Sequence, residues 1–544
     1  MKHTFTMQRG IYLIGGFIAL FGFAFILIRS DVVLKIPLFA ESHPTSIQSQ
    51  TVSQTDGAID SYLILDSKGD GLLATRLQER FRAIGKESSV MNIEHLTSLK
   101  DEETVIVATE HLDRLKDRDI LLDYVENGGT VLFATRPSPS DRLMEMYRQI
   151  GVIEIGSFVE TTGVRLTTSY FEEDVAKSFD SDRLLNSSLA LRIDPDANLL
   201  ATSSQDIPLL WSKDYGAGRF IVFNGTMLSE FNQQALLFVG LTQGKPLLRP
   251  ILNVEVTTLQ GFPFFASNER LVTKSMTDRD YFRNVLWADL QRLGAKYGLN
   301  YVLATTSPSL NPTPATSAYS EDLALYGRET LRSGGEIAVS GSSFEEIRAT
   351  KQQVDYALPG LNIKSSYQTD GELVRQVFDH ATTEIGAASL PIKEDAIIKL
   401  PSTPLELSDP DWTSWAHFNE LVTSGSVSMT LSPQTITAQA EGEALITAFQ
   451  SVLDEQGHDV PWLRSMKVSD VAQNHHFFNG HVYVRQSEDL YTYTLDEAAG
   501  ETYFYLQSPR KVTDVDQCEV ERIGPNLYLV KTEALSFSIR LEAK

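Results

Sequence analysis

Residues 277–305, TDRDYFRNVLWADLQRLGAKYGLNYVLAT, place an amphipathic helix directly ahead of a short apolar strand. Apolar side chains recur at helical spacing through residues 280–297, and the run at 300–304 has the length and composition of a buried strand. A helix followed at once by a buried strand is the repeating unit of parallel α/β folds. This stretch therefore predicts an α/β fold for the middle of the chain.

Similar units continue on both sides of this stretch. Apolar runs predict further strands, and the patterned segments between them predict further helices. The expected strands cover residues 251–256, 336–339, 397–400 and 427–431, and the expected helices cover residues 371–381 and 412–423. Repeated strand–helix units of this length fit a (β/α) barrel, complete or incomplete. We therefore expect a barrel domain over residues 246–473.

An earlier α/β domain is predicted over residues 59–245. Short apolar strands alternate with helices in its first half, which favours a doubly wound parallel sheet. Later, residues 209–211 and 219–224 are expected to form a hairpin. The segment DSKGDG at 66–71 joins the first strand to the first helix. Because it lacks the lysine and the full glycine pattern of nucleotide-binding loops, we interpret it as a tight connection.

The last part of the chain changes to the alternation of apolar and polar residues that is typical of strands. The alternating runs cover residues 481–485, 490–493, 502–506, 527–531 and 536–541. Five short strands in succession predict a compact β-rich domain of the sandwich type over residues 474–544.

The beginning of the chain contains a charge-free apolar run at residues 11–28. As a helix this run would span roughly 27 Å, which is close to the thickness of a bilayer. We expect a cytoplasmic N-terminus over residues 1–10, a transmembrane anchor at 11–28 and a polar linker at 29–58. A cleaved signal peptide is the competing interpretation. The expected protein crosses the cell membrane once and keeps its C-terminal domains outside the cell.

Charge and cysteine content exclude several functions. The net charge of −24 and the isoelectric point of about 4.9 repel phosphate backbones, so we expect no nucleic-acid partner, whereas a neutral or cationic polymer is compatible. Cys518 is the single cysteine, which rules out internal disulfides and multi-cysteine metal sites. His475, His476 and His481 form the densest histidine group. A hairpin at residues 479–480 would let His476 and His481 face each other, but a third metal ligand is not evident. We therefore expect neither a metal nor a cofactor.

Several segments of the barrel region together resemble the polysaccharide deacetylase-like family with a NodB-type barrel. They are LQGFP at 259–263, EIAVSGSSFEEI at 336–347 and PWLRSM at 461–466. More narrowly, the chain resembles membrane-anchored members that carry a glutamine amidotransferase-like domain ahead of the barrel, some of them in Pel-type exopolysaccharide loci. Amidotransferases use a cysteine nucleophile, and residues 59–242 contain none. That part of the resemblance therefore implies the scaffold alone.

The resemblance also implies where catalytic residues would stand. Active deacetylases use an Asp-Asp pair, one aspartate as general base and the other as a metal ligand. The two histidines of an H-G-x-x-H loop complete the site of the metal that activates water. At the corresponding positions this chain has Gln260 and Gly261, and Ser340 and Phe344. These side chains do not form an ordinary zinc site. The resemblance thus implies a barrel that has lost its catalytic groups, and we lean towards a protein that is not an enzyme.

Our leading hypothesis is a non-catalytic scaffold or glycan-binding subunit in exopolysaccharide biosynthesis, export or modification. Its expected partners are an extracellular polysaccharide and the membrane-bound proteins that synthesise or export it. The candidate sugar-stacking residues are Phe262, Phe264, Trp412 and Trp415, although aromatic residues beside strands are more often part of the core.

Two alternatives stay open. The first is an active carbohydrate esterase or glycoside hydrolase that uses other groups, such as His417, Asp409, Glu345 or Glu346. It predicts a pocket that contains two carboxylates, or a histidine and a carboxylate, with perturbed pKa values. The second is a purely structural envelope protein, whose cleft would be filled by its own side chains.

Overall fold

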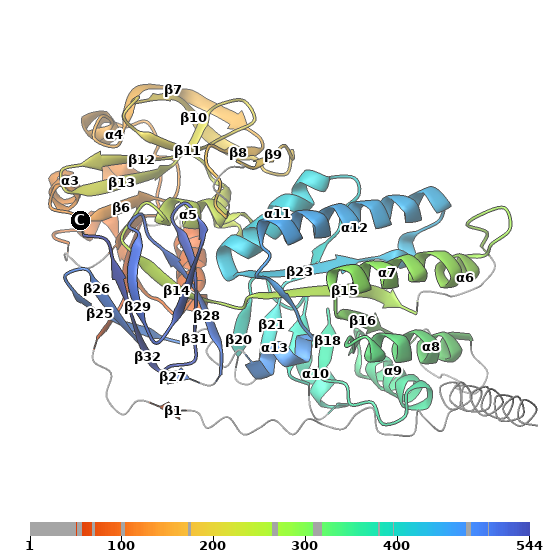
Figure 1. The fold of residues 1–544 in the computed structure, drawn as a ribbon. Helices are drawn as coiled ribbons and strands as arrows, with labels where there is room; N and C mark the ends of the chain where they lie inside the picture. Colours follow the sequence, from red (N-terminus) through yellow and green to blue (C-terminus); the bar gives the residue numbers. More distant parts are fainter. Residues whose placement is uncertain are drawn as a thin grey trace, which may run out of the picture. The chain divides into compact units, whose positions relative to one another are not determined.

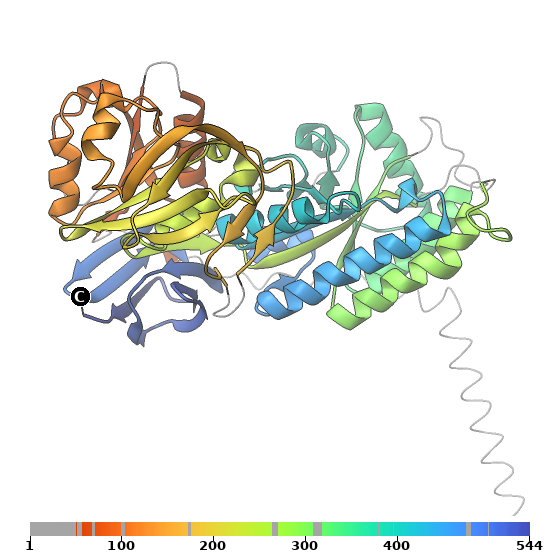
Figure 2. The same cartoon turned by 90° about the horizontal axis from the view of Figure 1, so that it is seen from above.

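The computed structural model describes residues 50–51, 57–67, 71–99, 104–171, 176–263, 270–307, 318–378, 381–394, 397–474, 480–498 and 500–543. The described residues form three groups of sheets, which Figures 1 and 2 show from two directions.

The first group is a nine-stranded sheet in the order β4-β3-β5-β6-β13-β12-β11-β8-β9. Its strands are β3 (Ser61–Asp66), β4 (Glu87–Asn92), β5 (Thr104–Val107), β6 (Thr130–Phe133), β8 (Val164–Leu166), β9 (Ser178–Phe179), β11 (Asn198–Thr202), β12 (Pro208–Tyr215) and β13 (Gly218–Phe223). The strands from β4 to β13 are parallel, whereas those from β13 to β9 pair antiparallel. The expected hairpin of β12 and β13 is confirmed. The expectation of a doubly wound parallel sheet is corrected, because half of the sheet is antiparallel.

Helices and a separate two-stranded antiparallel sheet accompany this sheet. They are α2 (Gly71–Ala83), η2 (Ile93–His95), η3 (Leu112–Arg114), α3 (Asp119–Glu126), α4 (Asp141–Met146), η4 (Met227–Ser229), η5 (Phe231–Gln233), α5 (Ala235–Leu241), and the strands β7 (Val152–Thr161) and β10 (Asn186–Ile193). Strands β5 and β6 are buried along their whole length, which explains their unbroken apolar sequences.

The second group is a ten-stranded sheet that curves as a half-barrel. Its main path runs β20-β21-β19-β18-β17-β16-β15-β23-β22. The strands are β15 (Val254–Phe262), β16 (Tyr301–Thr305), β17 (Glu336–Val339), β18 (Ser365–Tyr367), β19 (Thr383–Ile385), β20 (Ile392–Glu394), β21 (Ile397–Leu400), β22 (Thr403–Pro404), β23 (Ser426–Leu431) and β24 (Arg464–Ser465). All main-path pairs are parallel except β20 with β21, and the path ends at β20 and β22 without closing.

Helices cover this sheet. They are α6 (Asp278–Tyr281), η6 (Phe282–Leu286), α7 (Trp287–Tyr297), α8 (Ala318–Arg332), α9 (Phe344–Ala357), α10 (Gly371–Arg375), α11 (Pro410–Ser424), η8 (Pro433–Thr435), α12 (Gln439–Asp459) and α13 (Val468–Asn474). Helices α7 and α12 lie side by side, and α11 packs on β23 (Figure 2). Gly298 ends α7 in the left-handed conformation, so the sequence pattern at 277–305 does form a helix and then a strand.

The third group is a sandwich of two antiparallel sheets. One sheet contains β14 (Leu247–Ile251), β28 (Thr502–Gln507), β31 (Leu527–Thr532) and β30 (Glu519–Gly524). The other contains β2 (Ala58–Ile59), β25 (Val482–Ser487), β26 (Leu490–Leu495), β32 (Ser536–Leu541) and β29 (Val512–Asp516). A further pair joins β1 (Gln50–Thr51) to β27 (Glu497–Ala498). The core between the two sheets includes Tyr493, Phe504 and Phe537. The expected C-terminal strands are confirmed, and two strands from earlier in the chain join them.

One expected strand is in fact two. Residues 251–256 were expected to open the barrel, but β14 belongs to the sandwich and β15 begins the half-barrel at Val254. Asn253 lies between them with φ of 52°, which redirects the chain from one sheet into the other.

The expectation of a single-pass membrane protein is corrected. In the part of the chain that the structure describes, no helix combines the length and the apolar character needed to cross a bilayer. The run at 11–28, on which that expectation rested, lies outside the described residues. The described part of the chain is therefore a mixed α/β arrangement of sheets with a half-barrel.

Candidate functional site

The carboxyl ends of the parallel strands in the half-barrel are lined by neutral polar side chains. Gln260, near the end of β15, accepts a hydrogen bond of 3.1 Å from the Ser432 hydroxyl, which follows β23. Behind them, the hydroxyls of Ser402 and Thr430 are 2.7 Å apart, and the Tyr367 hydroxyl is 3.4 Å from that of Ser402. Ligand and catalytic sites of α/β barrels lie at this end of the strands. We call these five residues the strand-end cluster.

A β-bulge shapes the end of β15. The register between β15 and β16 shifts between Leu259 and Phe262, and Gly261 has φ of 71°. A Cβ atom on Gly261 would lie 2.9 Å from Cδ of Gln434, so the side chain of Gln434 rests directly against this glycine. The Oε1 atom of Gln434 is buried and has no hydrogen-bond partner among the described residues. The bulge therefore leaves space for the side chain of Gln434, whose amide oxygen has no partner among the described residues.

Of the two expected histidine positions, Ser340 directly follows β17 and Phe344 is the first residue of α9. Ser343 caps this helix by accepting a hydrogen bond from the backbone N–H of Glu346. In return, the Glu346 carboxylate accepts hydrogen bonds from the backbone N–H and the hydroxyl of Ser342, at 2.6 and 2.9 Å, and these bonds lower the pKa of Glu346. This is a capping box, which gives Glu346 a structural role.

The three described candidates for sugar stacking do not present free ring faces. Phe262 is buried against Trp287 and Tyr326, and Trp415 is fully buried and donates a 3.0 Å hydrogen bond to the Asn232 carbonyl. Trp412 is buried, with the guanidinium of Arg183 lying 4.0 Å from its ring centre. Phe264 lies outside the described residues. The three described aromatic residues are thus part of the core.

The buried carboxyl groups of this region do not form an acid–base pair at the strand-end cluster, because Glu255 and Glu336 lie at the amino ends of β15 and β17 and Glu420 lies on α11. Glu336 accepts a 2.7 Å hydrogen bond from the Ser469 hydroxyl and another from Ser365, and burial raises its pKa. Burial also raises the pKa values of Glu255 and Glu420 to about 7. Glu420 accepts a 2.8 Å hydrogen bond from the backbone N–H of Ser428, whereas Glu255 Oε1 has no partner among the described residues.

No group of three histidine, cysteine or carboxylate side chains converges as a metal site within the described residues. His475 and His476 lie outside them, and the Nδ1 atom of His481 is 3.4 Å from the Gly85 carbonyl oxygen. Cys518 is partly buried, and burial raises the pKa of its thiol to about 11. Such a thiol stays protonated at neutral pH and is a poor nucleophile.

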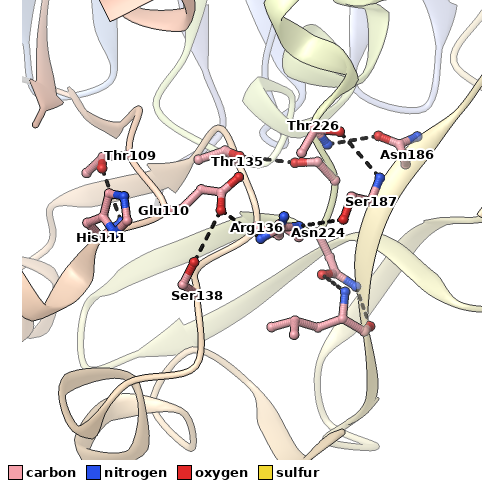
Figure 3. Close-up of polar contacts among 12 residues, drawn as sticks. Thr109, Glu110, His111, Thr135, Arg136, Ser138, Asn186, Ser187, Asn224 and Thr226 are labelled. Carbon is pink, nitrogen blue, oxygen red and sulfur yellow. Dashed lines mark hydrogen bonds and ion pairs between the residues drawn. The ribbon is translucent and has the colours of Figure 1, made fainter. Parts of the chain in front are cut away.

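The edge of the first sheet is a second candidate place, because ligands of open α/β sheets bind beyond the carboxyl ends of the strands. There, Arg136 forms a 2.8 Å ion pair with Glu110 and donates a 3.2 Å hydrogen bond to the Ser187 hydroxyl (Figure 3). Glu110 also accepts a 3.2 Å hydrogen bond from Ser138. This network ties the loops after β5 and β6 to β10. Residues 68–70 of the DSKGDG segment lie outside the described residues.

The residues proposed for an alternative hydrolase do not come together. Asp409 caps α11 and accepts a 2.7 Å hydrogen bond from the Ser181 hydroxyl, while Glu345 and Glu346 belong to α9. His417 is buried in the middle of α11, where it faces a different set of groups on α12.

Sequence reasoning missed Gln434, Ser402 and Gln456, which stand out only in the structure. Gln434 lies shortly after β23, and this position after a barrel strand is the one sequence signal that could have identified it. The unpaired state of a glutamine amide depends on its neighbours in space and leaves no trace in the sequence.

Comparison with known proteins gives one family match. The model of the family described as "Uncharacterised protein conserved in bacteria (DUF2194)" matches residues 172–342 and 381–529. No curated protein matches the sequence.

Among solved structures, three distant likenesses can be described. A protein from Parabacteroides distasonis, titled as a candidate glycoside hydrolase/deacetylase, has a TM-score of 0.29 and 9% identity over 47% of this chain and 82% of its own. An exo-beta-1,4-mannosidase from Opitutaceae bacterium strain TAV5 has a TM-score of 0.24 and 18% identity over 31% of each chain. A beta-galactosidase from Bacillus circulans has a TM-score of 0.24 and 12% identity over 31% of this chain and 29% of its own. The present chain thus spans about a third of the mannosidase and of the galactosidase, and none of these likenesses supports an argument about activity.

Proposed function

The chain belongs to the family described as an uncharacterised protein conserved in bacteria (DUF2194), and from that starting point we propose that it is a non-catalytic polysaccharide-binding protein. The proposed binding place is the strand-end cluster of the half-barrel together with Gln434. In this role the protein serves the synthesis, export or modification of a bacterial polysaccharide, as a scaffold or as the subunit that holds the glycan.

The observation that carries the proposal is the chemistry of the strand-end cluster. Gln260, Ser402 and Ser432 are half-buried, so their polar groups lie at the surface of the half-barrel and not in its core. Hydroxyl and amide groups both donate and accept hydrogen bonds, as do the hydroxyl groups of a sugar. The buried Oε1 atom of Gln434 has no partner within the described part of the chain, and a ligand hydroxyl that donates to it removes the cost of that unpaired acceptor.

The charge of the site selects the kind of polymer. All members of the strand-end cluster are neutral, and the chain carries a net charge of −24, which disfavours an acidic polysaccharide. A neutral polysaccharide fits these groups best. The proteins that synthesise or export that polysaccharide are the expected protein partners.

Binding of neutral oligosaccharides to the full chain, measured by titration calorimetry, tests this proposal. The probes are soluble oligomers of glucose, of galactose and of N-acetylglucosamine. We expect at least one of them to bind, and we expect the Gln434→Leu variant to bind it about tenfold more weakly, because leucine keeps the packing against Gly261 but removes the amide.

The matched control is Gln450→Leu. Gln450 lies on α12, where it hydrogen-bonds Asp454, away from the strand-end cluster. This variant should bind like the unmodified protein. The proposal would be contradicted if the Gln434→Leu variant bound an oligomer as tightly as the unmodified protein does. It would also be contradicted if the unmodified protein bound none of the oligomers, a result that would favour a purely structural protein.

A further inference from the structure

A second pocket lies between α11 and α12, where both helices meet the segment that leads into β9. It is a small, partly open pocket, and the free space within it and in the solvent at its mouth together amounts to about 390 Å³. Its polar lining comes from Lys177, Ser414, His417, Glu455, Gln456 and Asp459. Phe171, Phe418 and Val452 are among the apolar side chains that complete the wall. None of these residues belongs to the strand-end cluster.

Two side chains in this pocket hold buried polar atoms without partners. His417 is 4% exposed, and its Nε2 atom has no hydrogen-bond partner among the described residues. Gln456 is 9% exposed, and neither its Nε2 nor its Oε1 atom has one. Native proteins pair nearly all buried polar atoms, either internally or with water or a ligand. Three unpaired atoms in the wall of one pocket therefore mark a place that is built to receive something polar.

The charged groups of the pocket already satisfy one another. Lys177 lies 2.5 Å from the carboxylate of Glu455 and also forms an ion pair with Asp459. Although burial alone would lower it, the pKa of Lys177 is raised by these two carboxylates, so the ammonium group stays charged. Burial, assisted by the charge of Lys177, lowers the pKa of His417 to about 4, so the imidazole is neutral at pH 7. The pocket thus carries one cation against two anions, which disfavours an anionic ligand.

The same ion pairs argue against hydrolysis at this place. A catalytic histidine needs a carboxylate that orients its ring. Here both carboxylates are engaged with Lys177, and His417 Nε2 contacts neither of them. The groups are therefore arranged for binding and not for proton transfer.

We propose that this pocket binds one neutral sugar unit through two adjacent hydroxyl groups. A planar amide with both atoms free pairs with neighbouring hydroxyls, since one hydroxyl donates to Oε1 of Gln456 while the next accepts from its Nε2. His417 Nε2 supplies a third contact, and the edges of Phe171 and Phe418 face the carbon atoms of the sugar ring. The pocket is a separate site, which stands or falls independently of the strand-end cluster.

Nuclear magnetic resonance of the full chain with isotope-labelled histidine rings tests this inference. The probes are the methyl glycosides of glucose, galactose and N-acetylglucosamine, with 1,3-propanediol as a probe that lacks adjacent hydroxyls. The His417 signal is identified by its absence from a His417→Asn sample. We expect a glycoside to shift the His417 signal in a saturable way, and 1,3-propanediol to leave it unchanged.

The decisive variant is Gln456→Met, which fills similar space without the amide. We expect it to weaken binding of the glycoside at least tenfold, while Gln450→Met, one and a half turns earlier on the same helix, leaves binding unchanged. Equal binding by Gln456→Met would overturn the proposal. So would a His417 signal that no glycoside shifts, which would mean that water alone occupies the pocket. Since Gln434→Leu with oligomers reports on the other site, failure of one proposal is distinguishable from failure of the other.

Discussion

At the scale of single residues, the account depends on buried polar groups that the fold leaves without partners. Among the described residues, Gln434 has one buried amide atom without a partner and Gln456 has two, and Gln456 lines the pocket between α11 and α12. Glu255 also has an unpaired oxygen, where no ligand site is evident in the described part of the chain. The first two are interpreted as binding groups. Glu255 instead makes the stability of the protein depend on pH.

The Glu255→Gln variant should remove part of that pH dependence. The folded protein holds the Glu255 proton up to a pKa of about 7, while the unfolded chain loses it near the usual value of 4.5. Stability is therefore complete below about pH 4.5 and falls as the pH rises to 7, by at most about 1.4 kcal/mol per pH unit from this residue. Denaturant unfolding between pH 5 and 8 should show a smaller slope for Glu255→Gln and higher stability at pH 8.

The exposed Glu345→Gln variant is the control for this measurement, and it should keep the slope of the unmodified protein. The buried Glu420, whose pKa is also raised to about 7 by burial, leaves a residual slope of the same sign in Glu255→Gln. An unchanged slope in Glu255→Gln would show that this carboxyl group is not titrating from the buried state.

At the scale of elements, the end of β15 shows what a sequence can and cannot predict. Residues 277–305 predicted a helix and a strand, and α7 and β16 confirm them, because the apolar spacing there is local. The separation of β14 from β15 was missed, since one apolar run supplies both and the partner strand, β28, lies about 250 residues later. The Gly261 bulge was likewise hidden, because its reason is the side chain of Gln434 from beyond β23.

Replacing Gly261 by alanine should disturb both the bulge and the binding group. Alanine at φ of 71° is strained, and its Cβ would press on Gln434, so we expect a loss of about 1–2 kcal/mol in the free energy of unfolding. Oligosaccharide binding should weaken together with stability. Gly457→Ala is the matched control: it lies in α12 with open space around it, and alanine there should be neutral or stabilising by up to about 1 kcal/mol. Equal effects of the two substitutions would contradict this reading of the bulge.

At the scale of the described fold, one arginine connects all three groups of sheets. Arg249, in β14 of the sandwich, is fully buried and donates a 2.8 Å hydrogen bond to the Thr423 carbonyl of α11 and a 3.3 Å bond to Gln507 of β28. It also lies 3.5 Å from the hydroxyl of Tyr170, in the segment between β8 and β9. The sequence offered no sign of this role, since its partners are about 80 to 260 residues away.

The Arg249→Met variant should therefore lose about 2–4 kcal/mol of stability, because buried acceptors are left unpaired and a charged donor is removed. Differential scanning calorimetry should show the unfolding transition broadening or splitting as the sheets lose their common contact. Arg192→Met is the control: the exposed side chain of Arg192 pairs with Glu154 across the two-stranded sheet of β7 and β10, where the change should cost less than about 0.5 kcal/mol. A single sharp transition at the original temperature in Arg249→Met would show that Arg249 does not couple the sheets.

The central claim, a half-barrel that binds polysaccharide without acting on it, is tested most directly by measuring binding and turnover in one preparation. Oligomers of N-acetylglucosamine with and without O-acetyl groups are incubated with the full chain, with and without added zinc, while bound oligomer and released acetate are quantified. The account predicts saturable binding and no acetate beyond the protein-free control. Acetate released in many turnovers, and abolished by a chelator, would show that the protein is a metal-dependent esterase and that its catalytic groups lie elsewhere than at Gln260, Gly261, Ser340 and Phe344.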